Sequence, residues 1–139
     1  MRGDYGCTLD AKGRIIFPAK LREERGDSFV ISRDLDGCIT VWKNAEWEAF
    51  EGKLSAMGIK GISLQRYYSV NFLCEPDAQG RMLIPDSLRT HAGLKQGKDQ
   101  VVIIGIQNKA EIWDKDRWDA YNAKVEQMDL RSMQEALGL

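Results

Sequence analysis

The chain has few of the residues that carry most enzyme and metal chemistry. Its 139 residues include one histidine, His91, and three cysteines, Cys7, Cys38 and Cys74. No two cysteines have Cys-x-x-Cys spacing, so the ligand pattern of a zinc site is missing. One histidine also argues against a Ser-His-Asp or Cys-His catalytic arrangement. We therefore predict no catalytic residue, no metal and no cofactor, and we interpret the cysteines as small apolar packing residues.

The chain also lacks a long apolar run. The longest, Val101–Ile106, is interrupted by Gly105 and is far too short to cross a bilayer. The start, Met1–Asp4, has no apolar secretory stretch. We predict a cytoplasmic protein with no membrane contact. An apolar content of 43% and four tryptophans are enough for a folded core, and the length fits one compact domain.

A repeat is what the chain does contain. The segment 10–22, DAKGRIIFPAKLR, returns as 77–89, DAQGRMLIPDSLR, with seven of thirteen positions identical and three apolar exchanges. Such self-similarity indicates one structural unit written twice. Each half alone would bury little surface. Two halves that interleave around one core are therefore favoured over two independent small domains.

After a four-residue insertion the repeat continues at an offset of 71. The aligned apolar pairs are Trp42 with Trp113, Trp47 with Trp118, Phe50 with Tyr121, Leu54 with Val125 and Met57 with Met128. From the second pair onward the spacing of three, four and three is that of an amphipathic helix. The tryptophans could stack on bases, as in single-strand binders. Their place on these stripes favours the core instead.

Periodicity and turn residues predict the same order of elements in each copy. The predicted strands are 6–9, 14–17, 29–33, 38–42, 73–76, 81–84, 100–106 and 110–113. The predicted helices are 19–25, 44–57 with Asn44 as its N-cap, one within 62–72, 85–91 and 114–128, followed by a weakly amphipathic tail.

Two matching turns carry residues with defined backbone roles. Asp at the start accepts hydrogen bonds from backbone amides, glycine near the end supplies a positive φ, and proline begins the short helix. The structural turn residues are Asp10, Gly13, Pro18, Asp77, Gly80 and Pro85.

Basic residues cluster at these turns although the whole chain has a net charge of −1. Segments 10–25 and 77–98 each carry a net charge of +2. Local potential decides where a phosphate backbone binds. We expect Lys12, Arg14 and Arg22 to lie close together. The candidate DNA-binding residues are Lys12, Arg14, Lys20, Arg22, Arg81 and Arg89.

Arg14 has two interpretations that spacing alone does not separate. It could contact DNA, or it could pair with Asp10 across the turn as a brace. The second copy is less basic, because it has Gln79 in place of Lys12 and Ser87 in place of Lys20. We therefore expect the first loop to dominate binding.

The doubled Asp-x-x-x-Arg segments resemble the signature of the MraZ family. Segments 2–6 (RGDYG), 91–94 (HAGL) and 108–114 (NKAEIWD) are similar to that family as well. The resemblance implies a bacterial transcriptional regulator of the division and cell-wall genes, commonly a repressor of its own operon. By position, Lys12 and Arg14 match the family's DNA-binding loop, and Arg81 matches the second copy.

The resemblance also implies an α+β fold of two AbrB-like swapped-hairpin β-loop-β-α halves, interleaved into one pseudo-dimeric small barrel with flanking helices. The implied divisions are repeat one over 5–47, connecting helices over 48–73, repeat two over 74–118, and a C-terminal helix and tail over 119–139. Implied partners are double-stranded promoter DNA and further copies in a ring-shaped homo-oligomer, with nucleoid association and no small-molecule substrate.

Two other function classes are open at this point. One is a protein-binding module of antitoxin type on the same scaffold, although such proteins usually carry a single copy of the motif and a disordered tail. The other is a small enzyme, against which the single histidine argues.

Overall fold

The computed structural model describes residues 2–128 and 130–138. The fold is α+β, as predicted, with a six-stranded sheet and a separate two-stranded ribbon. The sheet order is β1-β7-β8-β4-β3-β5, and neighbouring strands are antiparallel. The sheet strands are β1 (Arg2–Leu9), β3 (Phe29–Arg33), β4 (Ile39–Trp42), β5 (Asn71–Cys74), β7 (Gly97–Ile106) and β8 (Lys109–Asp114). The ribbon strands are β2 (Arg14–Ile16) and β6 (Arg81–Leu83).

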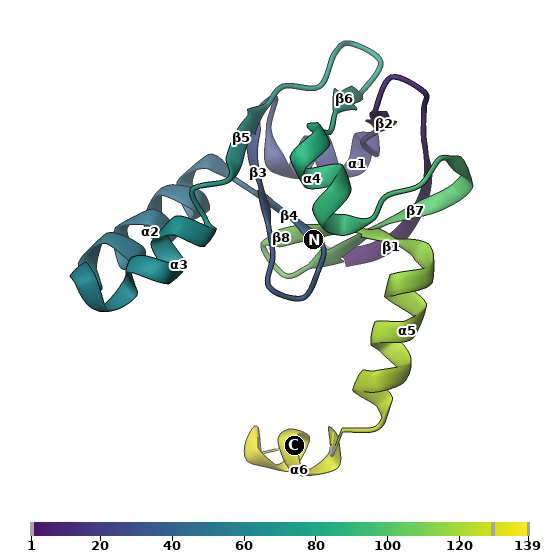
Figure 1. Ribbon diagram of the computed structural model, residues 1–139. Helices are drawn as coiled ribbons and strands as arrows, with labels where there is room; N and C mark the ends of the chain where they lie inside the picture. Colours follow the sequence, from purple (N-terminus) through teal and green to yellow (C-terminus); the bar gives the residue numbers. More distant parts are fainter. Residues whose placement is uncertain (1, 129, 139) are drawn as a thin grey trace.

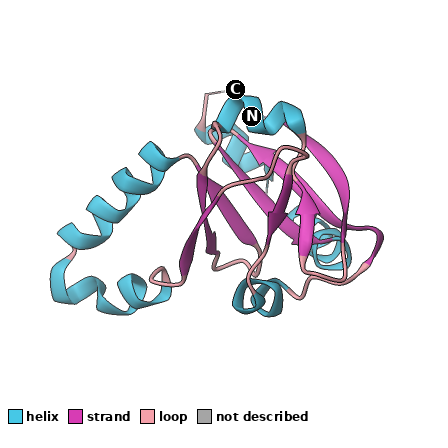
Figure 2. Cartoon of the chain, turned by 90° about the horizontal axis from the view of Figure 1, so that it is seen from above, coloured by secondary structure: helices cyan, strands magenta, loops and turns pink. Residues whose placement is uncertain are grey.

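The helices mostly fall where the sequence predicts them. They are α1 (Ala19–Arg25), α2 (Asn44–Ala56), the 3-10 helix η1 (Gly58–Gly61), α3 (Ile62–Tyr67), α4 (Asp86–Ala92), α5 (Lys115–Glu126) and α6 (Leu130–Ala136). The predicted cap at Asn44 is wrong, because Lys43 holds the N-cap position and Asn44 is already helical. The α2–α3 hairpin extends from one side of the sheets, and α5 and α6 extend from another (Figures 1 and 2).

The strands on either side of each predicted loop pair with the other copy of the repeat. β1 and β2 flank loop 10–13, and they pair with β7 and β6 of the second copy. In the same way β5, which precedes the second loop, pairs with β3 of the first copy. Strands from both copies are therefore interleaved within one sheet, so neither half has its own complete set of backbone partners.

The strand registers relate the two copies by an approximate two-fold axis. In the ribbon Ile15 lies opposite Met82, which is its own equivalent in the repeat. In the sheet Thr40 lies opposite Glu111, which is again its equivalent. Each of these pairs joins equivalent residues near the middle of the paired strands. If each strand is replaced by its equivalent in the other copy, the strand order of the sheet is simply reversed.

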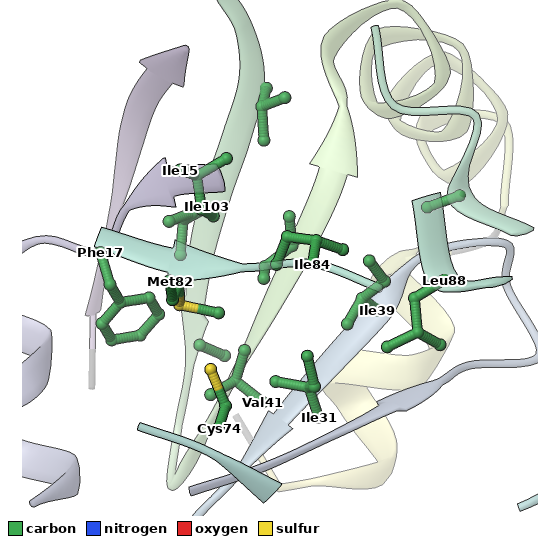
Figure 3. Packing of buried hydrophobic residues seen from close by; sticks show 14 of the residues in the cluster. Ile15, Phe17, Ile31, Ile39, Val41, Cys74, Met82, Ile84, Leu88 and Ile103 are labelled. Carbon is green, nitrogen blue, oxygen red and sulfur yellow. The ribbon is translucent and has the colours of Figure 1, made fainter. Parts of the chain in front are cut away.

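One apolar core lies between the ribbon and the sheet. Ile15 and Met82 enter it from the ribbon, and Ile31, Val41 and Ile103 enter it from the sheet (Figure 3). Leu21 of α1 and Leu88 of α4 are fully buried in the same cluster. The arrangement is compatible with the predicted small barrel. Its contributions from both copies mean that the core is completed only when the whole chain folds.

The opposite face of the sheet is covered by the two equivalent helices. Because side chains alternate along a strand, Val102 and Ile104 of β7 face away from the main core and pack in a cluster with Trp113 and the half-buried Trp118 of α5. Similarly, Val30 of β3 packs in a cluster with Trp47 and Leu54 of α2 and the half-buried Trp42 of β4. The predicted placement of the tryptophans in packing clusters is confirmed.

We predict a large difference between two isoleucine truncations. Ile103→Ala removes a fully buried side chain of the shared core and should lower the free energy of unfolding by about 2–5 kcal/mol. Ile59→Ala is the matched control, because Ile59 is 81% exposed and its loss should change stability by less than about 0.5 kcal/mol. Urea denaturation followed by circular dichroism measures both. Equal effects would contradict the shared core.

Candidate nucleic-acid interface

The outer face of the β2–β6 ribbon carries two arginines and two aliphatic residues. Ile15 and Met82 point into the core at 1% exposure, so their strand neighbours face outward. The register places Arg14 beside Leu83 and Arg81 beside Ile16. Ile16 and Leu83 are more than half exposed. The face therefore presents a cation and an aliphatic group twice, once from each copy.

Both arginines border the same shallow hollow in the surface. It is lined by Thr8, Asp10, Arg14 and Ile16 of the first copy, and by Arg81 of the second. The two loops and the ribbon lie at the end of the molecule opposite α5 and α6 (Figure 1). Residues that are 67 positions apart in the chain thus contribute to one surface.

The predicted brace between Asp10 and Arg14 is present. One carboxylate oxygen of Asp10 accepts the backbone N–H groups of Lys12 and Arg14, each at 2.9 Å. The other accepts Nε of Arg14 at 2.9 Å. The backbone N–H of Arg14 is the main cause of a lowered pKa of Asp10, and its guanidinium and the N–H of Lys12 lower that pKa further.

The brace and the DNA-contact interpretation are compatible. The Asp10 pair uses only Nε and leaves the two terminal nitrogens of Arg14 outside it. Those terminal groups are the ones that reach guanine O6 and N7 in bidentate recognition. The Arg14 side chain, which is 30% exposed, is thus held at Nε without its terminal nitrogens taking part in the pair.

The second loop repeats this geometry with one difference. Asp77 accepts the N–H groups of Gln79 and Arg81 at 2.9 Å and Nε of Arg81 at 2.7 Å. In addition, a terminal nitrogen of Arg81 donates to the side-chain oxygen of Gln79 at 3.3 Å. Lys12 occupies the equivalent place in the first loop and has no acceptor atom. Arg14 therefore has no such competitor at that place.

The structure places the other predicted cations in two different settings. Lys12, at the loop tip, and Lys20, on α1, are exposed. Arg22 and Arg89 are half-buried. The sequence groups Arg22 with Lys12 and Arg14, but its guanidinium lies against Gly80 of the other loop. The helix that follows each loop therefore contacts the loop of the other copy, which sequence spacing does not reveal.

The six turn residues build the two loops almost identically. Gly13 and Gly80 have φ values of 80° and 82°, which L side chains rarely adopt. Each glycine N–H donates to the carbonyl of the loop aspartate, Asp10 or Asp77, at 3.1 and 2.9 Å. Pro18 and Pro85 occupy the N-cap positions of α1 and α4, whereas the sequence predicts each proline as the first residue of its helix.

Among the described residues, one group has side chains suited to a metal. Ligand atoms of Asp34, Cys38 and Glu111 lie within 4.8 Å of one another. Burial raises the pKa of Cys38 far above its usual range and also raises the pKa of Glu111, which shifts both groups toward their neutral forms. Thr40 donates to Asp34, and Trp113 donates to Glu111. The group fits packing and hydrogen bonding better than cation binding.

The exposed aliphatic residues are the feature of this face that sequence analysis missed. Ile15, Ile16 and Phe17 form a continuous apolar run, which conceals the fact that only alternate residues are buried. A strand-period analysis starting at Arg14 would have placed Ile16 outward.

Among the described residues, no helix is long and apolar enough to span a membrane.

Comparison with known proteins identifies the family. The sequence pattern of the family described as "MraZ protein, putative antitoxin-like" matches residues 1–63 and 68–138. The chain is 43% identical over 129 residues to the transcriptional regulator MraZ of Ligilactobacillus salivarius, covering 90% of this chain and 88% of that protein. It is 44% identical over 121 residues to the protein of that name from Lachnoclostridium phytofermentans, covering 85% and 84%.

A third relative, the transcriptional regulator MraZ of Heliobacterium modesticaldum, is 41% identical over 127 residues, with 88% and 87% coverage. These names describe regulators and not enzymes, in agreement with the prediction of no enzymatic activity. Because the family pattern covers both halves of the repeat and the relatives span most of the chain, the protein belongs to the MraZ family.

Proposed function

We propose that this protein is a transcriptional regulator that binds double-stranded DNA through the β2–β6 face. The observation that carries the proposal is the pair of arginines, one from each copy, each held at Nε by its own aspartate. A two-stranded ribbon fits the major groove of B-DNA, and arginine is the commonest reader of guanine there. The names of the relatives support a role in transcription.

Each part of the face has a distinct role in this proposal. Arg14, and more weakly Arg81, read guanine edges, because Gln79 already engages one nitrogen of Arg81. Ile16 and Leu83 contact thymine methyl groups, which are the apolar feature of the major groove. Lys12 and Lys20 are exposed and contact phosphates. Arg22 and Arg89 flank the loops, and each guanidinium packs on the glycine of the other copy's loop.

The proposed regulator assembles from several protomers on repeated target sites. The interleaved copies correspond to two AbrB-like swapped-hairpin halves, and several protomers form a ring on repeated boxes upstream of the protein's own operon. One modestly basic face binds one box weakly. Linked faces make later contacts intramolecular and can raise the apparent affinity about 10²–10⁴-fold. Multivalency thus reconciles specific DNA binding with a net charge of −1. Repression of that operon, in the nucleoid, is the proposed outcome.

The second candidate is a protein-binding module of antitoxin type. Three apolar residues of the C-terminal region, Leu130, Met133 and Leu137, are 49%, 56% and 77% exposed. The family description also contains the term antitoxin-like. Removal of residues 129–139 separates the candidates, because it should leave the DNA affinity of a single β2–β6 face unchanged and abolish binding to a protein partner.

Arg14→Ala should weaken binding to a fragment of the protein's own upstream region by about 5- to 150-fold, or 1–3 kcal/mol, and relax selectivity at one base pair. Arg81→Ala should have a smaller effect. Arg66→Ala, which removes an exposed arginine of α3, is the matched charge control and should change little. Fluorescence anisotropy with wild-type and single-base-changed duplexes measures all three. An unaltered affinity of folded Arg14→Ala protein would exclude this loop.

Lys12→Ala and Lys20→Ala should weaken binding about equally for specific and random duplexes, because phosphate contacts carry no sequence information. Each substitution should reduce the slope of log affinity against log salt by about one. Titrations at several potassium chloride concentrations provide the slopes. Loss of affinity for the specific duplex alone would instead assign these lysines to base contacts.

A further inference from the structure

Backbone hydrogen bonds just beyond the ribbon join each loop to the other copy of the repeat. The N–H of Phe17, after β2, donates to the carbonyl of Gly80 at 2.8 Å. The N–H of Ile84, after β6, donates to the carbonyl of Gly13 at 2.9 Å. Each loop therefore ends against the strand that leads into the other copy's short helix.

An arginine from that short helix completes each junction. Nε of Arg22 donates to the carbonyl of Phe17 at 3.2 Å, and its guanidinium covers Gly80. A Cβ at Gly80 would lie 2.9 Å from Cζ of Arg22. A side chain at this position would displace the guanidinium, so glycine allows Arg22 to pack on the loop, and its positive φ also favours glycine.

Arg89 makes the equivalent contact with the first loop. A terminal nitrogen donates to the carbonyl of Ile84, and the guanidinium lies against Gly13, where a Cβ would be 2.6 Å from its Cζ. Arg89 also pairs with Asp86, for which the first copy has Ala19. The arginine packed on the loop that carries Lys12 and Arg14 thus has an ion pair that Ala19 cannot provide for Arg22.

The position of Gly13 affects the orientation of Arg14. The glycine N–H donates to the carbonyl of Asp10, and the N–H of Asp10 donates to the carbonyl of Arg14 at 2.9 Å, so loop and brace form one hydrogen-bonded unit. If Arg89 is removed, Gly13 loses the group packed on it, and the loop gains freedom that DNA binding must then remove. The pre-orientation of Arg14 therefore depends on a residue 75 positions away.

We propose that Arg22 and Arg89 are positioning residues, each of which holds the DNA-reading loop of the other copy. This inference rests on the proposed function of the β2–β6 face. In this proposal Arg89 positions Arg14 for base recognition, and Arg22 positions Arg81. Energetic coupling in DNA binding is therefore expected between Arg89 and Arg14 and between Arg22 and Arg81, which are residues of different copies.

A direct phosphate contact by the same arginines predicts different behaviour. Loss of such a contact would reduce the salt slope by about one, and lysine would largely restore it because the charge is retained. Loss of a positioning contact leaves the salt slope unchanged. Lysine fails to restore it, because the ammonium has neither the planar shape nor the fork of donors that covers the glycine and reaches the carbonyl.

The decisive experiment is a pair of double-mutant cycles measured by fluorescence anisotropy on the protein's own upstream duplex. Arg89→Ala should reduce affinity at least about fivefold and should not weaken the Arg14→Ala protein further. Arg22→Ala should instead be additive with Arg14→Ala and non-additive with Arg81→Ala. Arg89→Lys should behave like Arg89→Ala, with an unchanged salt slope. Additivity of Arg89→Ala with Arg14→Ala, or rescue by Arg89→Lys, would overturn the proposal.

Hydrogen exchange without DNA provides a readout that is independent of the proposed function. The N–H groups of Lys12 and Arg14, which donate to Asp10, should exchange faster in Arg89→Ala than in Arg22→Ala protein. Those of Gln79 and Arg81 should show the reverse. Equal exchange in both variants would refute the crossed contacts. If exchange changes in the crossed pattern but Arg14→Ala leaves the DNA affinity unchanged, the contacts between the copies are confirmed and only DNA recognition by this loop is refuted.

Discussion

The fold depends on backbone pairing between the two copies of the repeat. In the described part of the chain, β1 pairs with β7, β2 with β6, β3 with β5 and β4 with β8, each across the copies. The first strand and the ribbon strand of each copy therefore pair with strands of the other copy. Since unpaired buried amides and carbonyls are costly, the halves fold together, and the core between ribbon and sheet forms as one unit.

The same pairing creates the candidate binding face. Two short segments, each too small to form a surface alone, meet in a ribbon whose outer side carries Arg14 and Arg81. The approximate two-fold axis that passes between Ile15 and Met82 relates these arginines. Double-stranded DNA has two-fold symmetry of its own, so a face of this symmetry suits a duplex. Because Gln79 stands where the first copy has Lys12, the two halves of the face differ in charge while their loop backbones remain alike.

Residues of the same type have different surroundings in this structure. Arg14 and Arg22 both follow the loop aspartate within the first copy, yet Arg14 is held by Asp10 on the outer face and Arg22 packs over the second loop. Cys38 and Glu111 offer metal-ligand atoms but occupy an environment that shifts both groups toward their neutral forms. Residue type alone therefore does not assign a role on this scaffold.

The sequence by itself determined the duplicated unit, the turns at Gly13 and Gly80, most helix and strand positions, and the presence of an arginine after each turn. These features are local, since they depend on spacing, backbone conformation and apolar period. The tertiary structure alone decided that the strands pair across copies and that Arg89 covers Gly13. Those outcomes depend on contacts between residues about 65–75 positions apart, which no local pattern encodes.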